Sequence, residues 1–143
     1  MLLDENFILG IPRLRQIRVN NTHCRRTIEL DSSNFTCYAT YDKPIEYRDS
    51  FSSPTGEKYQ YTSPKITSAF SLSHIEGPYD RGGFIYQFRM NKSSNDEQII
   101  KLQKNQWFDL STRAMFIEVF SFNPNTELVT SLNILFEFLT TGK

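Results

Sequence analysis

The alternation of hydrophobic and polar positions is clearest toward the end of the chain, where it predicts two strands joined by a tight turn. Residues 113–122 and 128–138 are rich in aromatic and β-branched side chains with partial alternation, which is typical of half-buried strands. The Asn-Pro-Asn-Thr stretch at 123–126 favours a turn, because proline fixes φ and asparagine side chains bond nearby backbone. The sequence therefore predicts a β-hairpin between Trp107 and Phe138, around which the rest of the chain is organised.

The beginning of the chain predicts a helix followed by a strand. Residues 1–9 favour a short helix that ends at Gly10-Ile11-Pro12, since the residue before a proline avoids helical backbone. Residues 13–19 then alternate between two faces, with Arg15, Ile17 and Val19 on one of them, as in a strand.

The middle of the chain is less regular and carries three weaker predictions. Residues 59–62 favour a short strand, and residues 83–90 favour a longer one. Ser94 to Glu97 fits a capping box, so a helix is expected to start at Ser94 and to end at Asn105 or Gln106. The chain as a whole is expected to be an α+β domain, an antiparallel β-sheet flanked by a few helices with long irregular loops.

Composition limits the possible partners of such a domain. The 143 residues fit one domain, and 16 basic residues balance 16 acidic ones, so a strongly basic nucleic-acid module is not expected. One basic cluster invites that reading, but it lacks neighbouring aromatic stacking residues. Its members are Arg13, Arg15, Arg18, Arg25 and Arg26. We interpret them as strand arginines that pair with acidic groups or line an interface.

Cysteines and glycosylation sequons bear on the cellular compartment. Cys24 and Cys37 are thirteen positions apart and form a disulfide in an extracellular setting, or remain two buried thiols in a cytosolic protein. Three N-glycosylation sequons begin at Asn20, Asn34 and Asn91, and two of them flank or lie inside the cysteine loop. Together these features favour an extracellular or lumenal domain.

The distribution of hydrophobic residues bears on whether the chain is a whole cytosolic protein or part of a longer one. No apolar run reaches the roughly 18 residues that span a membrane, and no secretory signal precedes the first element. The chain is then either cytosolic or a segment of a longer protein. A segment is expected, because both ends run directly into element-like sequence.

The sequence shows no catalytic or cofactor site, and we expect neither an enzyme nor a cofactor. His23 beside Cys24 is a poor catalytic pair, since neighbours in sequence rarely face one substrate and a disulfide would consume the thiol. Two cysteines and two histidines lack metal-ligand spacing. Asp109 and Arg113 are interpreted as a turn with local hydrogen bonds and an ion pair.

Several segments closely resemble the extracellular domain of the polycystin family. The first is 10–19 (GIPRLRQIRV), followed by two cysteines at the family's spacing, and another is 107–118 (WFDLSTRAMFIE). Shorter similarities are the glycine pair at 82–83, the turn at 122–125 and the close at 136–142. The resemblance covers essentially the whole chain, and the motifs at 10–19 and 107–118 are quite specific.

The resemblance implies a domain in the loop between the first two transmembrane helices of a calcium-permeable channel subunit of the transient-receptor-potential class. It implies a Cys24–Cys37 disulfide, N-glycans, and contacts with other polycystin subunits in a homo- or heterotetramer in the plasma or ciliary membrane. Nucleic acid is not an expected partner.

Departures from the family pattern indicate a branch, and one rival function remains. Leu110-Ser111 stands where channel-type members have Arg-Gly, and Leu139 stands where they have proline. We therefore expect the receptor-like branch, the polycystin-1 and egg-jelly-receptor types. The alternative is a free-standing extracellular module that recognises a ligand through residues 47–83.

Overall fold

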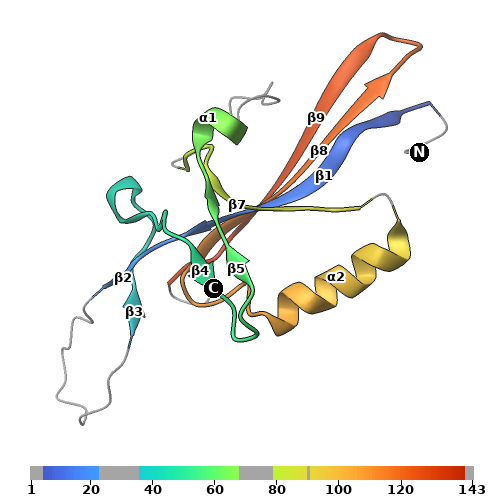
Figure 1. The fold of residues 1–143 in the computed structure, drawn as a ribbon. Coiled ribbons are helices and arrows are strands. Elements are labelled where there is room, and N and C mark those ends of the chain that lie inside the picture. Colours follow the sequence, from blue (N-terminus) through green and yellow to red (C-terminus); the bar gives the residue numbers. More distant parts are fainter. Residues whose placement is uncertain (1–4, 23–35, 68–78, 90, 141–143) are drawn as a thin grey trace.

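The centre of the molecule is a five-stranded antiparallel sheet (Figure 1). The structure is a computed structural model that describes residues 5–22, 36–67, 79–89 and 91–140. From one edge to the other the strands are β6 (Tyr61–Thr62), β7 (Gly83–Gln87), β1 (Phe7–Arg18), β8 (Thr112–Asn123) and β9 (Leu128–Glu137). The predicted antiparallel α+β architecture is confirmed in outline, with one substantial helix where a few were expected.

The predicted hairpin is confirmed as β8 and β9. The two strands pair from Ala114 with Glu137 to Asn123 with Leu128 without a shift in register. The Asn123 Oδ1 atom accepts the backbone N–H groups of Asn125 at 2.9 Å and Thr126 at 3.3 Å, which closes the turn as expected for asparagine.

The helix predicted for residues 1–9 is wrong in its described part. β1 begins at Phe7, which pairs with Phe122 of β8, so the long-range partner overrides the local helical pattern. The Gly-Ile-Pro stretch is an irregularity inside this strand, because the register shifts between Leu9 and Arg13 and Gly10 has a φ of 69°. The strand predicted over 13–19 is confirmed as the remainder of β1, which ends at Arg18.

Helix α2 (Lys92–Lys104) follows β7 and lies apart from the β8–β9 hairpin (Figure 1), and Leu102 is its buried residue. It starts earlier than predicted. Its N-cap is Asn91, whose side chain accepts the N–H of Ser93, so Ser94 lies inside the helix. The predicted end at Asn105 is confirmed.

Short elements fill the irregular middle of the chain. β2 (Asn21–Thr22) pairs with β3 (Cys37–Tyr38), and β4 (Phe51–Ser52) pairs with β5 (Lys58–Tyr59). A 3-10 turn spans Lys43–Ile45 and α1 spans Pro64–Thr67. The single strand predicted at 59–62 is thus two strands, which belong to different sheets.

The core lies on both faces of the sheet. On the helix side, Leu14, Phe84, Leu102 and Trp107 are buried, and the tyrosines and phenylalanines of the irregular middle pack against them. These packed aromatics are Tyr47, Phe51, Tyr59 and Tyr61. On the other face Ile17, Ala114 and Phe116 are buried. Among the helices of the described ranges, none has the length and apolar character required to cross a membrane.

Candidate functional site: a buried arginine frame and an apolar edge strand

The predicted cysteine and glycosylation residues fall on the periphery of the sheet. Cys37 starts β3 and is disulfide-bonded. Cys24 and Asn34 lie outside the described residues, so the pairing with Cys24 and the sequon at Asn34 stay predictions. Asn20 is exposed just after β1, and Asn91 is exposed between β7 and α2.

The arginines of β1 confirm the interpretation that they pair with acidic groups. The Arg13 Nε and Arg15 Nε atoms both donate to the Glu118 carboxylate in β8, the latter at 2.8 Å. Glu118 is 6% exposed, and the side chain of Arg15 is also 6% exposed. The buried pair therefore joins the two central strands from within the fold.

Arg15 also connects β1 to the glycine pair at the start of β7. Its Nη1 atom donates to the carbonyls of Asp80 at 3.0 Å and Gly82 at 3.1 Å, and its guanidinium lies 3.9 Å above the Phe116 ring. A Cβ at Gly83 would lie 2.7 Å from the Gln16 carbonyl oxygen. The glycine there permits β7 to approach β1 closely.

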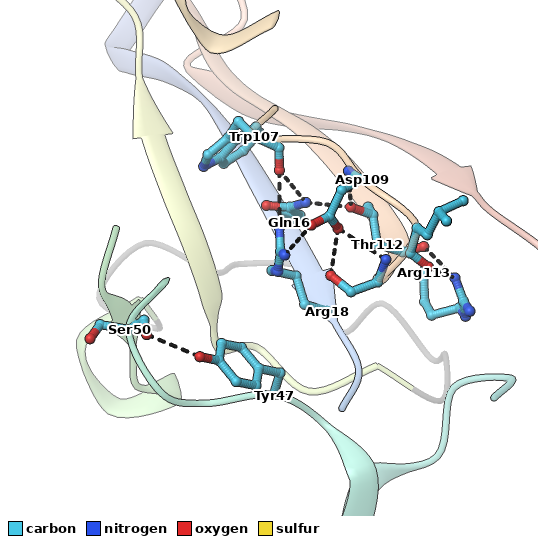
Figure 2. A network of polar contacts seen from close by, with 10 residues as sticks. Gln16, Arg18, Tyr47, Ser50, Trp107, Asp109, Thr112 and Arg113 are labelled. Carbon is cyan, nitrogen blue, oxygen red and sulfur yellow. Dashed lines mark hydrogen bonds and ion pairs between the residues drawn. The ribbon is translucent and has the colours of Figure 1, made fainter. Parts of the chain in front are cut away.

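A second network of hydrogen bonds, around Trp107, connects the segment that follows α2 to β1 (Figure 2). The Arg18 Nη2 atom lies 2.5 Å from the Asp109 Oδ2 atom, and Arg18 Nη1 donates to the Trp107 carbonyl at 3.2 Å. Gln16 Nε2 donates to the same carbonyl at 2.7 Å and to the Thr112 hydroxyl at 2.5 Å. The predicted ion pair between Asp109 and Arg113 is wrong, since Asp109 pairs with Arg18.

Arg113 instead joins the sheet to the segment that follows Cys37. Its Nε atom donates to the Ala39 carbonyl at 2.7 Å and its Nη2 atom to the Tyr38 carbonyl at 3.0 Å. Its Nη1 atom donates to the carbonyls of Leu110 and Thr112. Burial lowers the pKa of the Arg113 guanidinium, which nevertheless stays protonated.

Glu46 is the centre of a third polar cluster, which no pattern in the sequence indicates. Its fully buried side chain accepts the hydroxyls of Tyr41 at 3.0 Å and Tyr61 at 2.7 Å, and it pairs with Arg48. Burial, and next the negative charge of Glu46, raise the pKa of Tyr41 to about 12. Both tyrosines therefore remain hydrogen-bond donors at neutral pH.

The C-terminal end of α2 is held by Glu57, at the turn between β4 and β5. The Glu57 carboxylate lies 2.9 Å from the Lys101 ammonium and accepts a hydrogen bond from Asn105 at 2.6 Å. The hydrogen bond from Lys101 is the main reason that the pKa of the Glu57 carboxyl is lowered.

We expect Glu57→Gln to destabilise the domain at neutral pH and not in acid. A carboxyl with a lowered folded-state pKa stabilises the fold above its unfolded pKa, ordinarily 4.5, and this stabilisation is lost as the pH falls through the folded pKa. Urea unfolding of the wild type and Glu57→Gln from pH 7 to pH 3 measures the difference. Glu97→Gln, at an exposed position in α2, is the control. A difference that does not shrink in acid would contradict this assignment.

The polar clusters join strands of the sheet to one another and to the segments packed beside them. Within the described ranges, no three His, Cys, Asp or Glu side chains are grouped so as to hold a metal ion. In the segment 47–83, to which the alternative reading assigns ligand recognition, Tyr47, Phe51, Tyr59 and Tyr61 pack against the core, and residues 68–78 lie outside the described residues.

At the edge of the sheet, strand β9 exposes several apolar side chains to solvent. Three side chains of β9, Leu132, Ile134 and Phe136, are 50%, 41% and 44% exposed. They pair with Val119, Ile117 and Met115 of β8 and so lie on the face of the sheet that carries the core cluster around Trp107. The sequence predicts the strand β9 but not this exposed surface. Apolar positions on both faces of the strand do not show which face the rest of the fold covers.

The apolar edge continues past the end of β9. Phe138 and Leu139 are 42% and 52% exposed, and the Phe138 ring lies 6.4 Å from that of Phe108. We call the five residues Leu132, Ile134, Phe136, Phe138 and Phe108 the β9 strip. It is a contiguous apolar surface of the kind that marks interaction sites.

Comparison with known proteins identifies the family. The polycystin domain model matches residues 1–143. Polycystin-2-like protein 2 from Homo sapiens is 30% identical over 138 residues, which are 96% of this chain and 22% of that protein. Polycystin-2 from Danio rerio is 30% identical over 142 residues, 99% of this chain and 16% of that protein.

A third relative bears on the branch within the family. Polycystin-1 from Homo sapiens is 26% identical over 141 residues, 94% of this chain and 3% of that protein. The expected receptor-like branch is therefore not confirmed, since the polycystin-2 types are more similar. The matching motifs and the full-length match of the family model agree, and the chain belongs to the polycystin domain family.

Proposed function

We propose that this chain is the extracellular or lumenal domain of a polycystin-type cation-channel subunit, located in a loop of a larger protein of the plasma or ciliary membrane. It acts by contacts with other polycystin subunits in a homo- or heterotetramer and carries no catalytic role. Family membership and the disulfide-bonded Cys37 support this reading. The identities favour a polycystin-2-like subunit over a receptor-like one.

The β9 strip is the observation that carries the proposal. Within the described part of the chain, β9 pairs only with β8, so it is an edge strand. Natural edge strands are usually protected by charges, prolines or bulges, and β9 has none of these between Leu128 and Phe136. An unprotected apolar edge of this length favours a protein partner over exposure to water.

The composition of the strip fits the centre of a protein interface. Interface centres are depleted in charged side chains and enriched in aromatic ones, and the strip holds three phenylalanines and no charged residue. The nearest acid in β9, Glu137, accepts the Tyr79 hydroxyl at 2.8 Å. The proposed occupant is the corresponding domain of a neighbouring polycystin subunit.

Lysine placed in the strip is expected to prevent assembly while leaving the domain folded. Ile134→Lys and Phe136→Lys each put a charge at the centre of the proposed contact, at a cost of about 2 kcal/mol or more in association. Roughly a thirtyfold weaker association follows. Light scattering coupled to size exclusion of the detergent-extracted full-length protein measures the subunit number.

Ile100→Lys is the matched control. Ile100 is 51% exposed on α2 and lies outside the strip. We expect this variant to assemble as the wild type does. If the two β9 variants assemble normally while all three proteins unfold at the same temperature, the strip is not the subunit contact.

A further inference from the structure

A second apolar surface lies at the end of the sheet next to the β8–β9 turn, where β1, β8 and β9 extend beyond β7 (Figure 1). Phe7 of β1, Phe122 of β8 and Val129 of β9 are register partners and form one row across the three strands. Leu9 pairs with Phe120 in the neighbouring row. We call these five residues the tip patch; Phe7, Leu9 and Val129 are 48%, 41% and 46% exposed.

The strand register places the tip patch and the β9 strip on opposite faces of the sheet. Successive side chains of a strand point to opposite faces, so the even-numbered Phe120 and Phe122 of β8 share one face. The strip residues of β9 pair with the odd-numbered Met115, Ile117 and Val119 and therefore lie on the other face. One partner element cannot cover both surfaces from the same side of the sheet.

The tip patch has a polar border and no charge of its own. The next row on its face contains Arg13, Glu118 and Asn133, which are register partners across the same three strands. Neither the tip patch nor the β9 strip contains a charged residue. Packing one of these surfaces against the other would therefore leave no charge of theirs buried without a partner, as in the centre of a protein interface.

The symmetry of a channel requires that the β9 strip contact a different surface of the neighbouring subunit. A contact between two copies of one surface is complete in a dimer, whereas equivalent subunits arranged around one axis meet through two different surfaces. This step rests on the proposed function, in which four subunits surround one channel. The strip of each subunit then needs an apolar surface elsewhere on the next one.

The tip patch belongs to the largest group of exposed apolar side chains outside the strip in the described part of the chain. Six lie at this end of β1 and β9, namely Phe7, Ile8, Leu9, Ile11, Leu128 and Val129. The others are Ile99 and Ile100 on α2, and Leu110, Leu135 and Leu139. We propose that the tip patch of one subunit packs against the β9 strip of the next, so that each subunit presents one surface to each of its two neighbours.

Paired cysteines in the detergent-extracted full-length protein test this head-to-tail contact. Leu9→Cys and Ile134→Cys place thiols at exposed positions of the tip patch and of the strip, and a bifunctional maleimide joins thiols that lie close together. The protein with both substitutions should give cross-linked products of up to four subunits. A co-expressed mixture of the two single variants should give dimers at most. Ile100→Cys combined with Ile134→Cys is the control and should stay at the wild-type background.

The single variants separate this proposal from the proposed function. Dimers formed by Ile134→Cys alone would show that strip meets strip, which overturns the tip-patch contact and leaves the strip as a subunit contact. No product in any variant of a protein that remains tetrameric would remove the strip from the contact as well. A benzophenone maleimide on Leu9→Cys identifies the neighbour of the patch: we expect an adduct to residues 128–140 of a second subunit, and an adduct to lipid would overturn the proposal.

Discussion

Replacing Glu118 by glutamine is expected to reduce the free energy of unfolding by about 3 kcal/mol, a large part of the stability of a domain of this size. Glu118 accepts the Nε atoms of both Arg13 and Arg15 inside the sheet. Glutamine keeps the volume, but it lacks the charge and turns an amide donor toward one of the two guanidinium groups. The buried guanidinium of Arg15 would then lose its carboxylate counter-ion.

The expected loss in free energy of unfolding is near the lower end of the range for breaking a buried ion pair, because Arg15 keeps its other hydrogen-bond partners. The carbonyls of Asp80 and Gly82 and the ring of Phe116 still hold its guanidinium. Urea unfolding of the secreted domain measures the effect, with the exposed Glu97→Gln as the control. A loss below about 1 kcal/mol, the size of an ordinary substitution, would show that Glu118 does not hold the arginines in the fold.

The second large effect is expected at Arg113. Arg113→Lys keeps the positive charge but replaces a planar fork of donors by a single ammonium, which cannot reach the carbonyls of Tyr38, Ala39 and Leu110 together. The free energy of unfolding should fall by about 2 to 3 kcal/mol, the contribution of one or two charge-assisted hydrogen bonds with buried partners.

This variant should also change the chemistry of the nearby disulfide. Because Tyr38 and Ala39 follow Cys37 directly, releasing them from β8 makes the Cys37 disulfide more accessible to a reductant. We expect faster thiol release in a low concentration of dithiothreitol than in the wild type. Arg89→Lys, at an exposed position after β7, is the control. Equal reduction rates in the wild type and Arg113→Lys would show that Arg113 does not restrain this segment.

The elements that the sequence predicts correctly are those whose signals are local. The Asn-Pro-Asn-Thr turn and two flanking alternating runs define the β8–β9 hairpin without reference to the rest of the chain. The alternation that places Arg15 and Ile17 on one face of β1 is equally local, and it is confirmed because the Arg15 guanidinium lies over Phe116, the residue with which Ile17 is buried.

The incorrect predictions concern residues whose structure is determined by pairing with a segment distant in the sequence. Phe7 to Leu9 have a helical pattern, but β8 is available to pair with them. The partner of Asp109 is Arg18, 91 positions away, and not its neighbour Arg113. Such pairings depend on the register between β1 and β8, which the sequence of either strand alone does not specify.

The branch prediction, which is not confirmed, relied on a position that the fold does not constrain. Leu110 is 77% exposed in the turn before β8, and the turn is held by the Leu110 carbonyl, which accepts Arg113, together with the side chain of Asp109. The fold therefore places no demand on the side chain at position 110. A departure from the family pattern there says little about which branch the chain belongs to.

Amide hydrogen exchange along β9 tests the proposed subunit contact most directly. Phe138 donates its N–H to the Arg113 carbonyl of β8, and N–H groups in a strand point alternately to either side, so those of the odd-numbered residues from 129 to 137 point to the outer edge. These amides should exchange quickly in the isolated chain and markedly more slowly in the assembled full-length protein, where a neighbouring subunit covers the strip. Equal exchange of these amides in the two samples would contradict the account.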